Sequence, residues 1–81
     1  MYTVYILISQ KNPSKNYVGI TRDITKRLNE HNESPSCSYT IKYKPWDLIT
    51  FISFSDKKKA ENFEIYLKSH SGKAFLKKHF I

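Results

Sequence analysis

Two short runs of strand-forming residues, separated by a polar turn, constrain the fold of this chain most strongly. Residues Tyr2–Ser9 are rich in Val, Ile and Tyr, and Asn16–Ile20 resume that composition after a polar segment that contains a proline. β-Branched and aromatic residues favour strands, and Pro, Asn and Ser favour turns. Two such runs so close together predict an antiparallel hairpin. Because the first run is almost entirely apolar, we expect a central strand covered on both faces.

A helix and a loop are expected next. Asp23 is a favourable N-cap, and Ile24 and Leu28 recur at helical spacing, which predicts a helix from about residue 24 to residue 32. Residues 32–38 are polar and contain a proline, so they predict a loop.

The C-terminal half predicts one strand and two helices. Residues 46–54 alternate and then run apolar, as a strand does. Ser55 or Asp56 is then expected to cap a helix that reaches about residue 69 or 70. Ser71-Gly72 is expected to interrupt the helical pattern. Residues 73–80 predict a short last helix with Ala74, Phe75 and Leu76 facing inward. The predicted fold is a small α/β domain over residues 1–81, in the order β-β-α-β-α-α, with a three-stranded, mostly antiparallel sheet flanked by helices.

The charge of the chain indicates a polyanionic partner. Fourteen Lys and Arg residues against seven Asp and Glu give a net charge of +7 over 81 residues. Nucleic acid is the commonest partner of such a basic surface, and a merely solubilising charge is the alternative. An anionic membrane is less favoured, because the basic residues do not form one face of an amphipathic helix. We expect a nucleic-acid partner, DNA first, and a monomer or weak homodimer.

The compartment follows from cysteine usage and hydropathy. The single cysteine, Cys37, lies in a Ser-rich segment and has no partner for an internal disulfide, which suits a reducing compartment. No apolar run approaches a membrane span, and residues 1–9 are too short for a signal sequence. We therefore expect a cytoplasmic protein.

Five residues are candidates for chemistry. Tyr5 and Tyr17 lie on the paired strands, where each is otherwise an ordinary packed tyrosine. Arg27 and His31 are four residues apart on one helix face, where they could hold a phosphate or simply face solvent. Glu64 lies at the margin of a buried stripe, where it could bind Mg²⁺ with water and substrate phosphate or pair with Lys68.

Basic residues are further candidates for contact with nucleic acid. The run Lys57-Lys58-Lys59 opens a helix against its dipole, which is compatible with a phosphate-facing role. Basic and aromatic residues also interleave just before Pro45. The predicted contacts to nucleic acid are Lys15, Arg22, Lys42, Lys44 and Lys68.

Taken together, these segments resemble the GIY-YIG nuclease superfamily, and its small single-domain bacterial members most closely. The segments that carry the resemblance are Val4-Tyr5-Ile6-Leu7, Tyr17-Val18-Gly19-Ile20-Thr21, Arg27-Leu28 with Glu30-His31-Asn32, Lys44-Pro45-Trp46-Asp47-Leu48, and Ala60, Glu64 and Lys68. The first motif reads Thr3-Val4-Tyr5 in place of Gly-Ile-Tyr.

The resemblance implies a metal-dependent endonuclease that hydrolyses phosphodiester bonds of DNA, with structure-selective or weakly sequence-selective cleavage. It implies that Tyr5 or Tyr17 helps to activate the attacking water and that His31 moves a proton or orients a tyrosine. It also implies that Arg27 stabilises charge on the phosphate and that Glu64 holds a divalent metal, Mg²⁺ or Mn²⁺. The alternatives are a non-catalytic nucleic-acid-binding module, which the charge alone supports, and a small scaffold that binds another protein.

Overall fold

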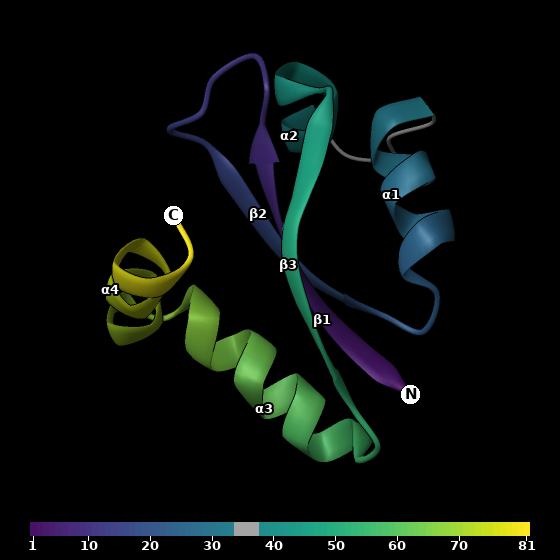
Figure 1. Cartoon of the computed structure of the whole chain (residues 1–81), viewed down its shortest axis with the longest axis vertical. Helices are drawn as coiled ribbons and strands as arrows, with labels where there is room; N and C mark the ends of the chain where they lie inside the picture. The colour runs from purple at the N-terminus through teal and green to yellow at the C-terminus, as the bar shows by residue number, and fades with distance from the viewer. Residues whose placement is uncertain (34–37) are drawn as a thin grey trace.

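A three-stranded antiparallel sheet with helices on both sides forms the fold (Figure 1). The structure, a computed structural model, describes residues 1–33 and 38–81, so Cys37 lies outside the described residues. The elements in chain order are β1 (Tyr2–Ser9), β2 (Asn16–Thr21), α1 (Ile24–Glu33), α2 (Ser38–Tyr43), β3 (Trp46–Phe54), α3 (Lys57–Lys68) and α4 (His70–His79).

The predicted hairpin and the central position of β1 are confirmed. The strand order is β2-β1-β3, and β1 pairs antiparallel with both neighbours. In the hairpin register, Tyr5 lies opposite Gly19 and Leu7 lies opposite Tyr17. Directly opposite residues share one face of a sheet, so Tyr5 and Tyr17 project to the same side.

Alternate residues of β1 enter two separate cores. Val4 and Ile6 are buried in an aliphatic cluster with Leu67 of α3 and Leu76 of α4. On the other face, Tyr5 packs with Leu7 and Trp46 and with side chains of α1 and α2. Figure 1 shows α1 on one side of the sheet and α3 and α4 on the other. The two cores explain why β1 is apolar along almost its whole length.

Aspartate side chains begin the two helices that carry the candidate residues. The carboxylate of Asp23 accepts a hydrogen bond from the backbone N–H of Lys26 at 3.1 Å, at the start of α1. The carboxylate of Asp56 accepts from the backbone N–H of Lys58 at 2.8 Å and of Lys59 at 3.3 Å, at the start of α3. Side-chain oxygens at these positions satisfy amides that have no partner within the helix. Both predicted caps are therefore confirmed.

The structure adds a short helix that the sequence reading lacks. Of the predicted loop over residues 32–38, the two ends are helical, since α1 extends to Glu33 and α2 begins at Ser38, and residues 34–37 lie outside the described residues. The side-chain amide of Asn32 donates to the carbonyl of Trp46 at 3.1 Å, and its oxygen accepts from the Trp46 amide at 2.6 Å. The end of α1 is thus tied to the start of β3.

The last helix begins earlier than predicted. The break lies at Ser69, whose hydroxyl accepts from the Gly72 amide at 3.1 Å and caps α4. Gly72 is inside α4 and buried, and a Cβ there would lie 2.5 Å from the Cα of Leu67. The expectation that Ser71-Gly72 interrupts the helix is wrong, because the glycine instead lets α4 pack closely on α3. Ala74, expected to face inward, is exposed.

Candidate active site

A hydrogen-bonded group of aromatic side chains lies between the sheet and α1. The hydroxyl of Tyr5 lies 2.9 Å from Nε2 of His31, in a buried contact. The ring of Tyr17 is centred 4.8 Å from the His31 ring and 6.2 Å from the Tyr5 ring. We call Tyr5, Tyr17 and His31 the phenol–imidazole cluster. Three residues far apart in the chain therefore meet in one place.

Gly19 makes room for this cluster. It lies opposite Tyr5 in the hairpin register. A Cβ at position 19 would lie 2.9 Å from Cε1 of Tyr5 and closer still to its hydroxyl carbon and oxygen. Any side chain here would push the Tyr5 ring from its position. The glycine therefore permits the close approach of the Tyr5 ring.

Burial sets the protonation states of Tyr5 and His31. Burial lowers the pKa of His31 below its ordinary value, and the nearby Arg27 lowers it further. Burial also raises the pKa of Tyr5 well above its ordinary value, and Tyr17 adds to the rise while Arg27 opposes it. At neutral pH the imidazole is therefore neutral and the phenol protonated, so the Tyr5 hydroxyl can donate to His31. A standing phenolate at Tyr5 is not favoured.

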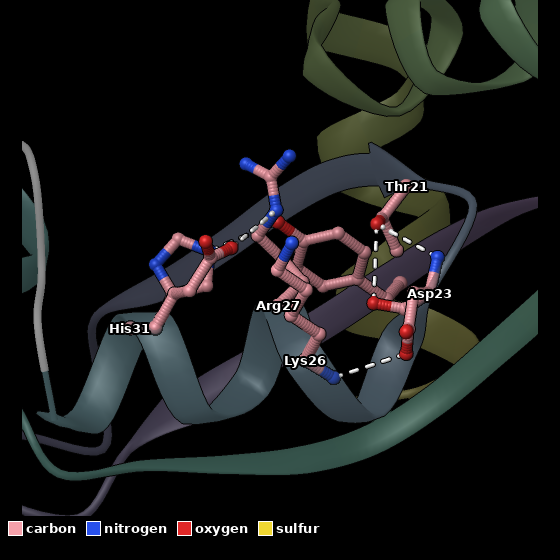
Figure 2. A network of polar contacts seen from close by, with 7 residues as sticks. Thr21, Asp23, Lys26, Arg27 and His31 are labelled. Atoms are coloured by element: carbon pink, nitrogen blue, oxygen red, sulfur yellow. Dashed lines mark hydrogen bonds and ion pairs between the residues drawn. The ribbon is translucent and has the colours of Figure 1, made fainter.

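Arg27 extends from the same side of α1 as His31, as Figure 2 shows. Its Nε lies 3.4 Å from a carboxylate oxygen of Glu30, and its side chain is 44% exposed. Arg27 lines a groove of about 500 Å³ at the end of β2. We call it the arginine groove, and its charged lining residues are Arg22, Asp23, Lys26, Arg27, Glu30, Lys57 and Glu61. A guanidinium in an open groove beside the cluster is available to a phosphate.

Glu64 belongs to α3, the helix on the other face of the sheet. Its carboxylate is 2.7 Å from the ammonium of Lys68, and its side chain is 16% exposed. The pairing with Lys68 considered from the sequence is therefore present. The charge of Glu64 still raises the pKa of Tyr5, although it is the weakest of the groups that do so.

The donor set limits what a metal could use. Within residues 1–33 and 38–81, no three His, Cys, Asp or Glu side chains are grouped so as to hold an ion. Mg²⁺ can be bound through one or two carboxylates when water and substrate phosphate supply the other oxygens. A metal at Glu64 would have to displace the ammonium of Lys68, whose side chain is 54% exposed.

The predicted nucleic-acid contacts fall into four places. Arg22 lines the arginine groove and lies over the Tyr2 ring at 5.4 Å. Lys15 and Lys42 both lie over the Tyr43 ring, at 5.7 and 5.4 Å. The other two predicted contacts, Lys44 at the end of α2 and Lys68 beside Glu64, are exposed. Of the basic run on α3, Lys57 lines the arginine groove.

Two features of the site were missed from the sequence. Lys73 and Lys77 of α4 line a second groove with Lys15 and Lys68, and only the packing of α4 on α3 brings them there. Thr3, which replaces the glycine of the first motif, is buried, and its hydroxyl lies 2.8 Å from that of Ser53 on β3. Such cross-strand hydroxyl pairs stabilise sheets, and this one accounts for a threonine at that position.

Comparison with known proteins assigns the family. The family model of the GIY-YIG catalytic domain matches residues 1–78. The chain belongs to the GIY-YIG family. The resemblance proposed from the sequence is confirmed, and so is the small α/β fold.

Similar proteins come from bacteria. The UPF0213 protein YazA of Bacillus subtilis is 40% identical over 64% of this chain and 52% of its own length, so the match spans about half of that relative. The UPF0213 protein lwe0147 of Listeria welshimeri is 32% identical over 85% of this chain and 77% of its own length. Membership in the GIY-YIG family indicates a nuclease family. The names of these relatives state no reaction, so they leave the substrate open.

A solved structure agrees with the fold. The solution NMR structure of the UPF0213 protein BH0048 from Bacillus halodurans matches with a TM-score of 0.56 and 28% identity, over 96% of this chain and 84% of that one. Separately, each helix within residues 1–33 and 38–81 is too short or too polar to cross a lipid bilayer.

Proposed function

We propose that this GIY-YIG protein is a divalent-metal-dependent endonuclease that hydrolyses phosphodiester bonds of DNA. The observation that carries the proposal is the 2.9 Å contact between the Tyr5 hydroxyl and His31 Nε2, with Arg27 acting electrostatically on both groups. Attack of water on a phosphodiester needs a proton acceptor, a hydroxyl and a guanidinium. Membership in a family of catalytic domains and the net charge of +7 support the same reading.

Tyr5 and His31 act together on the attacking water. The Tyr5 oxygen accepts a proton from the water while its own proton passes to Nε2 of neutral His31, so the hydroxyl is regenerated as the water becomes nucleophilic. The lowered pKa of His31 keeps the imidazole available as an acceptor at neutral pH. The packed ring of Tyr17, 4.8 Å from the imidazole, holds His31 in this orientation.

Arg27 stabilises the phosphate as charge develops on it. A guanidinium can donate two parallel hydrogen bonds to two phosphate oxygens. Groups aimed at charge that grows in the transition state contribute most when they are already in place. The arginine groove gives a phosphate room beside Arg27, at the end of β2 next to Gly19.

Glu64 is the proposed metal ligand. Its carboxylate would hold Mg²⁺ or Mn²⁺ by one or two oxygens once Lys68 moves away. A bound divalent ion would polarise the phosphate and support the leaving oxygen. In the mechanism, this chain's own residues provide the proton transfer through Tyr5 and His31 and the charge stabilisation through Arg27.

Selectivity should depend on DNA structure more than on sequence. The candidate contacts are lysines and arginines, and such residues fix position on the backbone without reading bases when they bind phosphates. We therefore expect cleavage that is structure-selective or weakly sequence-selective.

The experiment is a cleavage assay on single-stranded, duplex and branched DNA and on RNA, with Mg²⁺ or Mn²⁺ titrated from zero. Wild type should cut DNA only with metal, and Glu64→Gln should lose cleavage while Glu33→Gln, at an exposed carboxylate outside the arginine groove, retains it. The proposal fails if wild type cuts none of these substrates, or if Glu64→Gln cuts as fast as wild type.

A second candidate is a nucleic-acid-binding module without catalysis. The 2.7 Å ion pair of Glu64 with Lys68 favours it, because that pair occupies the carboxylate. Such a module would bind DNA with strong salt dependence and would be indifferent to EDTA and to Glu64→Gln. Turnover that needs both metal and Glu64 excludes this candidate.

A further inference from the structure

A second groove lies along β2, on the opposite side of Gly19 from the arginine groove. It has a volume of about 700 Å³ and is lined by residues 16–18 of β2 and by side chains of α3 and α4. The arginine groove is lined by residues 20 and 21 of the same strand. The two grooves therefore flank Gly19, the residue against which the Tyr5 hydroxyl packs.

The second groove is strongly positive. Four lysines line it, Lys15, Lys68, Lys73 and Lys77, and its described lining residues include no Asp or Glu side chain. We call it the lysine groove. In the arginine groove, by contrast, the cationic side chains are accompanied by Asp23, Glu30 and Glu61. The lining of the lysine groove therefore carries more net positive charge than that of the arginine groove, although Lys68 pairs with Glu64, which lies outside the lining.

The floor of the lysine groove is apolar. Val18, Leu67 and Leu76 line it and are 6%, 0% and 2% exposed. An apolar floor beneath a rim of lysines suits a ligand whose charged backbone alternates with flat, less polar groups. A nucleic-acid strand has this character, with phosphates for the lysines and sugars and bases for the floor.

The lysine groove is continuous with the candidate active site through two residues. Tyr17 lines the groove and packs against His31, with ring centres 4.8 Å apart. Lys68 lines the groove and pairs with Glu64 at 2.7 Å. A ligand lying in the groove would thus reach the phenol–imidazole cluster at one end and the Glu64 carboxylate along its side.

We propose that the lysine groove binds the phosphodiester backbone of the nucleic acid on one side of the bond to be cut. The inference rests on the proposed function, which places the scissile phosphate beside Gly19 and Arg27 and so puts the lysine groove on one side of the cut. It assigns Lys73 and Lys77 as binding residues, together with Lys15 and Lys68. A phosphate that engages Lys68 also draws it away from Glu64 and frees that carboxylate, so binding of substrate and of metal become coupled.

The test compares two double variants that remove equal charge. Lys73→Ala with Lys77→Ala removes two lysines of the groove, and Lys11→Ala with Lys78→Ala removes two exposed lysines outside its lining. Binding of a short fluorescein-labelled DNA strand is measured by anisotropy in EDTA, over a series of salt concentrations. Because each lost phosphate contact lowers the salt slope by about one, the groove variant should lose about two units of slope and on the order of tenfold in affinity. The control pair should stay close to wild type.

A second arm tests that binding lies on one side of the cut. Shortening the DNA on one side of the cleavage position should raise KM for wild type and leave kcat unchanged, and the groove variant should be insensitive to that shortening. Equal sensitivity to shortening on both sides would overturn the one-sided arrangement.

The outcomes separate this inference from the proposed function. If wild type cleaves but the two double variants bind equally, the groove assignment fails and the nuclease stands. If no protein cleaves but the groove variant alone binds weakly, the groove stands and the nuclease fails. If a polyglutamate peptide binds with the same lysine dependence and DNA does not, the groove belongs to an acidic protein partner and the inference is overturned.

Discussion

Neighbouring residues of β1 enter two different environments on opposite faces of one sheet. Ile6 is 1% exposed and belongs to the aliphatic cluster with Val4, Leu67 and Leu76. Tyr5 is also 1% exposed, yet its hydroxyl is bonded to the imidazole of His31. Burying a polar group costs free energy unless it is hydrogen-bonded, so the contact with His31 offsets the cost of burying the Tyr5 hydroxyl. One face of the sheet is therefore an aliphatic core, while the other also contains the polar groups to which the proposed function assigns chemistry.

The edge strand β2 is where the two faces meet. Gly19 accommodates Tyr5 from one face, while α3, with Glu64, packs beside β2 on the other. The charge of Glu64 still reaches Tyr5. A site that uses groups from both faces has to be at an edge, because the middle of a sheet separates them.

The largest effect should come from the apolar face. Ile6→Ala removes buried methyl groups and should lower the free energy of unfolding by about 2–5 kcal/mol, measured by urea denaturation. For a domain of this size the total is about 4–12 kcal/mol, so the variant should fold only marginally. Ile6→Val, at about 0.5–1.5 kcal/mol, should stay folded and keep wild-type cleavage. A loss of cleavage in folded Ile6→Val would mean that the two faces are not separable.

Arg27→Ala should show the opposite pattern. The side chain is 44% exposed, so stability should change little, whereas cleavage should fall by about 10²–10³-fold through lost stabilisation of the phosphate. Single-turnover rates and urea denaturation of the same preparation check both halves. Arg27→Lys should recover part of the rate, and Lys11→Ala should serve as the charge control. Wild-type cleavage in Arg27→Ala would remove it from the mechanism.

The two glycines give a matched pair across the faces. Gly19→Ala forces a Cβ against the Tyr5 ring and should cost about 1–3 kcal/mol of stability, and Gly72→Ala forces one against the backbone of Tyr66 and Leu67 and should cost at least as much. Only Gly19→Ala should also reduce cleavage at temperatures where both variants are folded, because it displaces Tyr5 from His31. Equal effects on cleavage would show that the Gly19 contact is only structural.

The smallest effect expected is on pH dependence. His31 has a folded pKa below its unfolded value, so between the two values the unfolded chain binds more protons. Stability should therefore fall as pH drops from the unfolded value of about 6.5 through the folded pKa. Cleavage should fall in the same direction, since protonated His31 cannot accept a proton. Urea denaturation and rate profiles from pH 5 to 8 of wild type and His31→Asn check this, and an unchanged stability slope in His31→Asn would contradict it.

The sequence predicted most of the fold, and its failures have physical causes. Residues 46–54 were predicted as a strand and form β3 over that whole range, because Pro45 and the Asp56 cap bound a clear apolar run. The six-residue helix α2 shows no such pattern. Gly72 reads as a helix breaker from its propensity alone, yet tertiary packing keeps it inside α4.

The site was predictable only in part. The residue types of the phenol–imidazole cluster were identified from the sequence, but the Tyr5–His31 contact joins residues 26 positions apart. The rise in the pKa of Tyr5 depends on burial that no local pattern reveals. Lys73 and Lys77 had no signal of their own, since the groove exists only once α4 packs against α3 and β2.

The most direct test removes the hydroxyl oxygen of one tyrosine on each side of the sheet. Tyr5→Phe deletes the hydroxyl that contacts His31, and Tyr66→Phe deletes one from an exposed tyrosine of α3. Under single-turnover conditions with saturating Mg²⁺, the account predicts that Tyr5→Phe stays folded and loses cleavage by about 10²-fold or more, while Tyr66→Phe cleaves like wild type. Cleavage by folded Tyr5→Phe at the wild-type rate would contradict the role given to the buried phenol and imidazole.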